Sequence, residues 1–241
     1  MGVHRFYPVH LFVVKIMHML LENLIPHGFQ TQLHYPPQSL EERPLKELYL
    51  SLSETYRYDQ FSLLGAGQGA VLKQGNHRHT EIYPDRLTVK EQPTSLSFDE
   101  YSEQALAIAK EIREKIRIPV WVLQQSQIRF LVPFEEAVTP LMKERIFSVP
   151  DEALQVFERP ILGMCLRLEF PPTTEKPSQM QLRVEPYFRP NEEKMLYLEL
   201  TSRFLQPTPN NEEISLRDQE AYAFIREKAC SFLETCFAAQ D

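Results

Sequence analysis

Residues 62–76, SLLGAGQGAVLKQGN, contain four of the chain's seven glycines. The letters GAGQGA within them come close to the G-x-G-x-x-G/A spacing of a loop that binds a dinucleotide pyrophosphate. Such a loop must open a helix, because the free N–H groups of the first helical turn bind the phosphates. Here the turn dipeptide Gly75-Asn76 follows Ala70 after only four residues. We therefore expect a hairpin turn and no NAD or FAD cofactor.

Histidines and cysteines offer two further kinds of site. His77 and His79 flank Arg78 and could supply half of a metal site, but no third ligand has a matching spacing and the arginine opposes a cation. The three cysteines are Cys165, Cys230 and Cys236. They form no C-x-x-C pair and lie in no nucleophile motif, so we expect them to be buried or inert thiols. No metal is expected.

Catalytic motifs are absent from the sequence. It contains no G-x-S-x-G, H-E-x-x-H or Walker-type pattern, so we expect no catalytic residues and no enzyme. Lys and Arg total 26 against 33 Asp and Glu, a net charge of −7 without charged blocks. This net charge argues against a broad surface that binds nucleic acid. It does not exclude a small local basic patch.

The N-terminal stretch is the most apolar part of the chain. We predict a mostly buried helix over 9–25, with a strand at 9–16 and a shorter helix as the alternative. Lys15, His18 and Glu22 form a polar stripe on it, which argues against a membrane span. Together with the unpaired cysteines, this stripe predicts a cytoplasmic protein without a membrane partner.

Two connecting segments follow. Proline and glycine in 26–45 predict an irregular connection. Residues 47–55 fit both a strand and a helix, and we favour a helix that starts at Pro44.

A first β-meander follows this segment. Short apolar runs separated by turn residues predict strands at 59–64, 70–74, 79–83 and 86–91. A long helix comes next, over 98–116, with Ser97 and Glu100 as its capping box. After it we predict a strand over 120–132 and two short helices that begin at prolines, over 140–147 and 150–157.

A second meander lies within 161–205. Three segments there alternate apolar and polar residues, which is typical of an antiparallel sheet covered on one side. A closing helix over 215–237, with Ser215 and Asp218 as its capping box, is expected to cover that sheet. The predicted fold class is α+β: an antiparallel sheet built from two β-meanders, each followed by a long helix packed on one face.

The domain organisation has two open interpretations. Residues 1–241 form a single α+β domain in both. In one of them, 58–118 and 161–237 are pseudo-repeated halves behind an N-terminal helical segment, 1–57. The sequence Ile-Arg-Glu-Lys occurs in both halves, at 112–115 and 225–228, but at different distances from the predicted helix caps. The duplication is therefore a hypothesis about architecture.

The polar positions of the second meander form the candidate interaction face. Its members are Arg167, Glu169, Arg183, Glu185, Tyr197, Glu199 and Arg203. A solvated face with cross-strand ion pairs would explain them. A recognition surface or dimer face would explain them too, because Arg and Tyr are enriched at interfaces.

Three stretches carry a resemblance to a known family. Asp85, Arg86, Leu87 and Val89 match a "DR-apolar-x-apolar" strand, and LRLEFPP at 166–172 matches an "LRL-x-FPP" strand ahead of a closing helix. Over about 79–237 the chain resembles a sporadically distributed bacterial family of proteins of unknown function. The chain departs most from the family pattern before residue 58, because members of that family more often open with a strand where we predict a helix. The resemblance implies an accessory or defence-associated component and supplies no catalytic residues.

From these observations we expect a non-enzymatic protein-interaction or oligomerisation module, with a protein partner or self-association. The alternative is a small-ligand-binding protein with an apolar pocket between the sheet and the C-terminal helix.

Overall fold

The computed structural model describes residues 23–65, 67–189 and 194–237. Its centre is one antiparallel sheet of nine strands in the order β2-β3-β4-β5-β1-β6-β9-β8-β7. The strands are β1 (Ile25–His34), β2 (Gln60–Leu63), β3 (Ala70–Gln74), β4 (Arg78–Tyr83), β5 (Arg86–Glu91), β6 (Leu123–Pro133), β7 (Leu166–Phe170), β8 (Ser178–Pro186) and β9 (Met195–Phe204). The predicted α+β class with an antiparallel sheet is confirmed.

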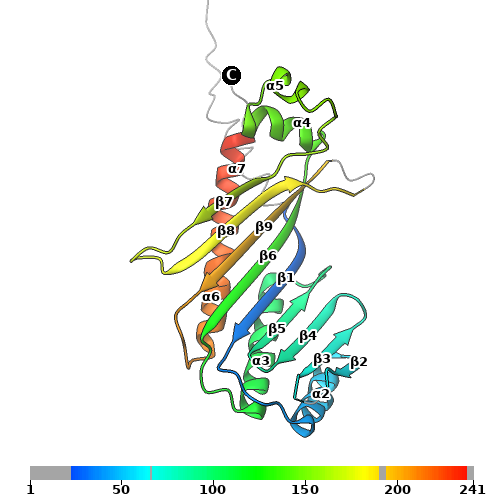
Figure 1. The fold of residues 1–241 in the computed structure, drawn as a ribbon, viewed down its shortest axis with the longest axis vertical. Helices are drawn as coiled ribbons and strands as arrows, with labels where there is room; N and C mark the ends of the chain where they lie inside the picture. The colour runs from blue at the N-terminus through cyan, green and yellow to red at the C-terminus, as the bar shows by residue number, and fades with distance from the viewer. Residues whose placement is uncertain (1–22, 66, 190–193, 238–241) are drawn as a thin grey trace, which may run out of the picture.

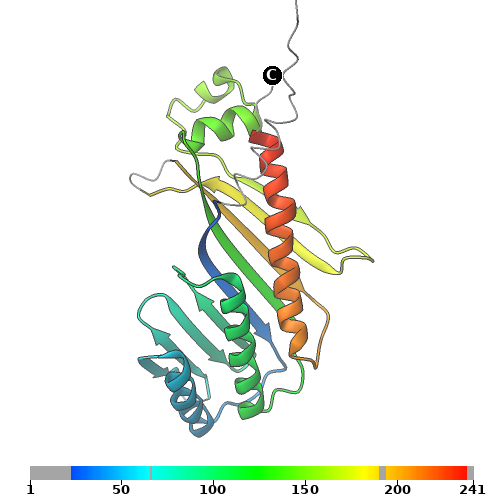
Figure 2. The same ribbon diagram turned by 180° about the vertical axis from the view of Figure 1, so that it is seen from behind.

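Helices cover one face of this sheet. They are α2 (Glu42–Tyr56), α3 (Phe98–Ile116) and a long C-terminal helix made of α6 (Glu212–Ala223), the π-helical segment η2 (Phe224–Ala229) and α7 (Cys230–Phe237). Figure 2 looks onto the helices, and Figure 1 onto the opposite face of the sheet, which no helix in the described residues covers and which we call the bare face. A smaller cluster, α4 (Val138–Met142), η1 (Lys143–Phe147) and α5 (Asp151–Gln155), lies at one end, next to α7.

Apolar side chains at alternate positions of the strands form the core. In β8, Met180, Leu182 and Val184 are buried under the C-terminal helix, while the residues between them are half-buried on the other face. The α3 helix begins with the predicted capping box of Ser97 and Glu100. In the described part of the chain, no helix is both long and apolar enough to cross a membrane.

The two predicted meanders meet through β1 and β6. The first, β2 to β5, leads into α3, and the second, β7 to β9, leads into the C-terminal helix. Between them β1 and β6 pair antiparallel, with Phe29 opposite Ile128. On each side of the β1–β6 pair, the last strand of a meander lies next to the pair and the first strand lies at the edge of the sheet. Duplication of the halves stays a prediction.

The N-terminal prediction was wrong where the structure describes it. Residues 25–34 form β1, which lies between β5 and β6, whereas we expected the end of a helix and then an irregular connection. The segment ahead of residue 58 is therefore not wholly helical. The alternatives for 9–16, and the helix prediction up to residue 22, lie outside the described residues. The helix favoured over 47–55 is confirmed as α2.

The cap predicted for the C-terminal helix was also wrong. This helix starts at Glu212, three residues before Ser215. Ser215 lies inside the first turns, where its hydroxyl is 3.3 Å from that of Ser102 on α3. Asp218 is 1 % exposed and faces the sheet. The S-x-x-D pattern matched a capping box in letters alone, because Ser215 contacts helix α3 and Asp218 contacts the sheet.

Candidate interaction surface

The bare face of the sheet carries every residue of the predicted interaction face. Arg167 lies opposite Arg183, which lies opposite Glu199. Glu185 lies opposite Tyr197, and the Arg203 guanidinium donates to the Gln125 side chain at 3.1 Å. Glu169 accepts a hydrogen bond from Gln181 at 2.9 Å. The pairing of the strands of the second meander thus brings these seven residues to one face of the sheet.

A buried ion pair is the centre of this surface. The Arg129 Nε donates to Glu199 at 2.8 Å, and both side chains are about nine-tenths buried. Glu199 also accepts from the Tyr197 hydroxyl at 2.8 Å and from Gln127 at 2.9 Å. Burial, followed by the contact with Glu199, raises the pKa of Tyr197 above its usual range. Arg129 and Gln127 were missed by the sequence analysis, although both occupy alternate positions in the strand predicted over 120–132.

Aromatic rings flank the buried pair. His27, in the bulge of β1, meets the ring of Tyr187 edge-on with centroids 5.3 Å apart. The rings of Tyr187 and Tyr197 lie nearly parallel with centroids 6.3 Å apart. Because this cluster is packed and hydrogen-bonded within one chain, it makes that part of the face a rigid platform.

The outer edge of β7 is the most accessible backbone of the surface. β7 pairs with β8 on one side, and no strand in the described residues pairs with its other side. Arg167 and Glu169 are exposed on the bare face, and Phe170 on the helix face is 37 % exposed. An unpaired strand edge of this kind is a template for pairing with another chain.

A cavity of about 540 Å³ lies between the β7–β8 hairpin and the C-terminal helix. Its apolar lining includes Phe170, Met180 and Phe224. The rings of Phe170 and Phe224 meet edge-on with centroids 5.1 Å apart. Lys176 and Lys228 are among the charged residues at the cavity. The alternative function predicted from the sequence, small-ligand binding, assumed a pocket at this place, between the sheet and the C-terminal helix.

Comparisons with known proteins leave the family of this chain open. No protein-family model matches the chain. No curated protein matches it either. Two solved structures of the RNA triphosphatase Pct1 from S. pombe, one of them in complex with the Spt5 CTD, align with it at 11 % and 10 % identity. They cover 96 % and 97 % of this chain and 91 % of their own, but the TM-score is 0.12 for each, so they indicate neither fold nor function.

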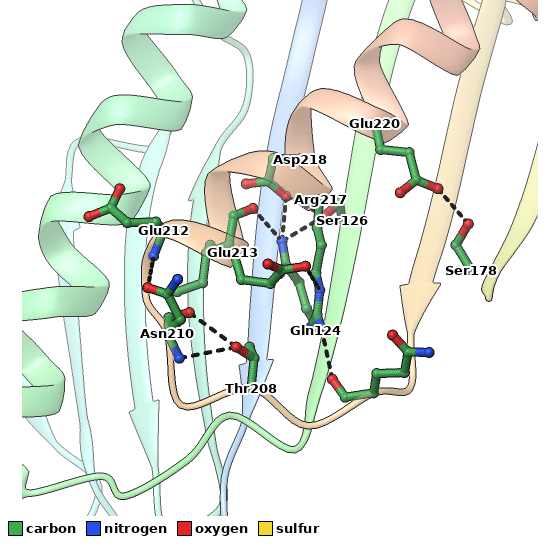
Figure 3. A network of polar contacts seen from close by, with 12 residues as sticks. Gln124, Ser126, Ser178, Thr208, Asn210, Glu212, Glu213, Arg217, Asp218 and Glu220 are labelled. Carbon is green, nitrogen blue, oxygen red and sulfur yellow. Dashed lines mark hydrogen bonds and ion pairs between the residues drawn. The ribbon is translucent and has the colours of Figure 1, made fainter. Parts of the chain in front are cut away.

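A second polar cluster is enclosed between sheet and helix. The Asp218 carboxylate on α6 accepts hydrogen bonds from Thr31 on β1 at 2.9 Å, from Gln124 on β6 at 2.8 Å and from the hydroxyl of Ser126. Figure 3 shows Asp218 turned toward the two β6 residues. The Tyr101 hydroxyl on α3 lies 3.1 Å from that of Thr31. One carboxylate therefore ties the C-terminal helix to both central strands.

The electrostatics of Asp218 follow from its burial. All three hydrogen-bond donors to it are neutral, and desolvation raises the pKa of Asp218 to about 6 despite these bonds. The sequence carried a signal for this residue. Ile214, Asp218, Ala221 and Ile225 are spaced by four, three and four residues, which places the acid in an apolar helix stripe.

The structure places the histidines and cysteines that the sequence offered as candidate metal ligands or nucleophiles. His79 lies in β4 on the bare face, whereas His77 precedes the strand. Among the described residues, no group of three His, Cys, Asp or Glu side chains could hold a metal ion. Burial raises the pKa of Cys230 to about 12 and also raises the pKa of Cys165 and of Cys236. The glycine stretch joins β2 to β3 as a hairpin turn, as predicted.

Proposed function

We propose that this chain is a non-enzymatic, cytoplasmic self-association module that pairs with a second copy of itself through the edge of β7. The observation that carries the proposal is the sequence of that edge, Leu-Arg-Leu-Glu-Phe, at an unpaired margin of the sheet. It agrees with the expectation of an oligomerisation module. The accessory or defence role implied by the family resemblance is compatible with it.

Antiparallel pairing centred on Leu168 makes this edge complementary to its own copy. Arg167 then lies opposite Glu169 of the second copy, and the same pair forms again across the two-fold axis. On the helix face, Leu166 lies opposite Phe170 of the second copy. Cross-strand ion pairs and apolar pairs of this kind each stabilise a sheet by roughly 0.2–1 kcal/mol. Backbone hydrogen bonds along the edge add to them.

The geometry also limits the length of the pairing. Pro171 and Pro172 directly follow β7, and proline cannot donate a backbone hydrogen bond. The pairing is therefore confined to about the five residues of β7. The charges fix the register, because a shift of two residues would place Arg167 opposite Arg167, or Glu169 opposite Glu169, of the second copy.

Charge reversal tests the pairing. In the single variants Arg167→Glu and Glu169→Arg, two like-charge pairs replace two ion pairs in each dimer, and we expect about 10- to 100-fold weaker self-association. The double variant Arg167→Glu/Glu169→Arg restores opposite charges and is expected to restore the dimer. Multi-angle light scattering across a range of protein concentrations measures this. Arg203→Glu, which makes the same charge change on an inner strand, should leave the mass unchanged.

Two results would overturn the proposal. One is a wild-type chain that stays monomeric at all concentrations. The other is a double variant that associates as weakly as the single variants, which would place Arg167 and Glu169 in separate contacts. Circular dichroism of each variant shows whether the fold is intact.

A second candidate function rests on the cavity beside Phe224. Its volume of about 540 Å³ lies in the range of small-ligand sites, roughly 300–1,000 Å³. We propose an amphipathic small molecule as its ligand. Native mass spectrometry should detect such a molecule on the purified chain, and the cavity-filling variant Ala223→Trp should lose it. A purified chain that carries nothing and takes up no amphipathic probe would contradict this candidate.

A further inference from the structure

Three basic side chains of the first meander form a line across adjacent strands on the bare face. Lys73 on β3 lies opposite His79 on β4, and His79 lies opposite Lys90 on β5. All three are half-exposed. Side chains directly opposite each other in a sheet have Cβ atoms about 5 Å apart. The sheet therefore aligns three groups that can each carry a positive charge.

This arrangement is unfavourable for the protein alone. Lys73 and Lys90 lie on either side of His79, two strand spacings or about 10 Å apart, and like charges repel each other. Neither Lys73 nor Lys90 forms an ion pair with any residue that the structure describes. Burial, followed by the charges of Lys73 and Lys90, lowers the pKa of His79, while the charge of Glu81 opposes this effect. A bound anion would relieve the repulsion.

Amide side chains continue the line. Lys90 lies opposite Gln30, Gln30 opposite Gln127, and the line goes on through Thr201 to Gln181. A neighbouring row contains Gln32, Gln125 and Gln179. The first row runs from β3 to β8, about 29 Å at ~4.8 Å per strand. The Gln127 amide is already bonded to Glu199 and Arg129, whereas the Gln30 amide can offer a donor and an acceptor, the pair of groups that base edges present.

The bare face differs in charge from the rest of the chain. Its basic strand residues are Lys73, Arg86, Lys90, Arg129, Arg167, Arg183 and Arg203, and its acidic ones are Glu81, Glu169, Glu185 and Glu199. These charges give the face a net +3, whereas the whole chain carries −7. The positive charges come from separate strands, so no basic block is visible in the sequence.

We propose that the bare face binds single-stranded nucleic acid along the Lys73–His79–Lys90 line and the adjoining amide rows. Lys73 and Lys90 contact phosphates, and Gln30 contacts the edges of unpaired bases. The Arg86 guanidinium, 4.2 Å from the ring centroid of Tyr83 on the same face, offers a further cation with an aromatic surface.

Single strands suit this face better than duplexes or acidic peptides. No helix in the described residues projects from the bare face into a groove, and the amides of a flat sheet reach bases only when these are unpaired. An acidic peptide would use the lysines but leave the paired donors and acceptors of the glutamine amides without a role. Lys73 on β3 and Lys90 on β5 lie far from β7 in the strand order, so substitutions of these lysines leave the β7 edge unchanged and either proposal can fail alone.

Fluorescence anisotropy with a labelled 20-nucleotide RNA of mixed sequence tests the site on the full chain. We expect saturable binding that weakens with salt, and about tenfold or greater loss of affinity in Lys73→Glu/Lys90→Glu. The milder Lys73→Gln/Lys90→Gln variant should lower the slope of log affinity against log salt by about 1.4, since each single-strand phosphate contact contributes about 0.7. The Lys73→Gln/Lys90→Gln variant should fold at least as stably as the wild type, because it removes the repulsion between the two lysines.

The matched control is Lys176→Glu/Lys228→Glu, which makes the same charge change at the cavity beside the C-terminal helix. It should keep wild-type affinity. Absence of RNA binding by the wild type at 50 mM salt would overturn the proposal, as would an equal loss of affinity in the control. Displacement of the RNA by poly-glutamate at equal charge concentration would assign the face to acidic polypeptides instead and so contradict it.

Discussion

Replacing Asp218 with asparagine is expected to remove a pH dependence of stability of about 3 kcal/mol. The folded chain holds this carboxyl at a pKa of about 6, against 3.8 for an ordinary aspartate. Each unit of pKa difference corresponds to about 1.4 kcal/mol. Asparagine keeps an oxygen for Gln124 and Ser126 and offers an N–H to the Thr31 hydroxyl, so the network survives without a titrating group.

The sign of the effect distinguishes Asp218 from paired surface carboxylates. Its pKa is raised in the folded state, so the folded chain binds a proton more tightly than the unfolded one. The stability that this proton contributes is complete below pH 3.8 and is lost as the pH rises to about 6. Tyr101, the nearest titratable group of the network, has a pKa well above 10 and stays neutral throughout.

Urea unfolding of the wild type and Asp218→Asn between pH 4 and 7.5 measures this difference. We expect the free energy of unfolding of the wild type, relative to the variant, to fall by about 2.5 kcal/mol over that range, which covers most of the full effect. The comparison cancels the titration of the other carboxylates. A difference that does not change with pH would mean that Asp218 has an ordinary pKa in the folded chain.

Alanine at Gly69 is expected to destabilise the fold by about 2–4 kcal/mol. Gly69 has φ +108°, and an added Cβ would lie 1.8 Å from the Ile82 carbonyl oxygen on β4. That oxygen belongs to the backbone of a paired strand, so it cannot move aside as a flexible side chain would. The turn between β2 and β3 must open or the β3–β4 ladder must shift.

Gly65 supplies the control for this prediction. It has a similar φ of +105°, but an added Cβ would meet no atom within 4 Å. Gly65→Ala should therefore show only the backbone strain, about 1 kcal/mol. Thermal unfolding of both variants separates strain from the steric clash, and equal losses would show that the close approach of Gly69 to β4 is unimportant.

Local patterns predicted much of this fold. Short apolar runs between turn residues located the strands of the first meander, alternating apolar residues located those of the second, and Ser97 with Glu100 located the start of α3. The glycine stretch also follows this logic, because Gly75-Asn76 excluded a helix after Ala70. Each of these features is determined by residues that are close together in the sequence, so it can be predicted without knowing which distant strands pair.

Long-range features were harder to predict. Proline and glycine in 26–45 suggested a connection, yet β1 forms because Phe29 and Leu33 are buried in the core and both its edges find partners. Asp218 matched a helix cap, yet hydroxyls and an amide from distant strands hold it inside. The Lys73–His79–Lys90 line exists only after three strands pair.

The two proposals describe one continuous surface. Antiparallel pairing of β7 with a second copy keeps residues of the same face together. Two sheets would then join edge to edge, with helices on one side and two bare faces on the other. A single-stranded nucleic acid would find two basic lines on that surface, one from each copy.

Self-association through β7 is the central claim, and hydrogen exchange of the unmodified chain tests it most directly. Amides of residues 166–170 should exchange more slowly as the protein concentration rises through the monomer–dimer range, because pairing protects the outward N–H groups. The opposite edge strand, β2 at residues 60–63, should show no change. Exchange at β7 that stays constant while light scattering reports a doubling of mass would contradict the account.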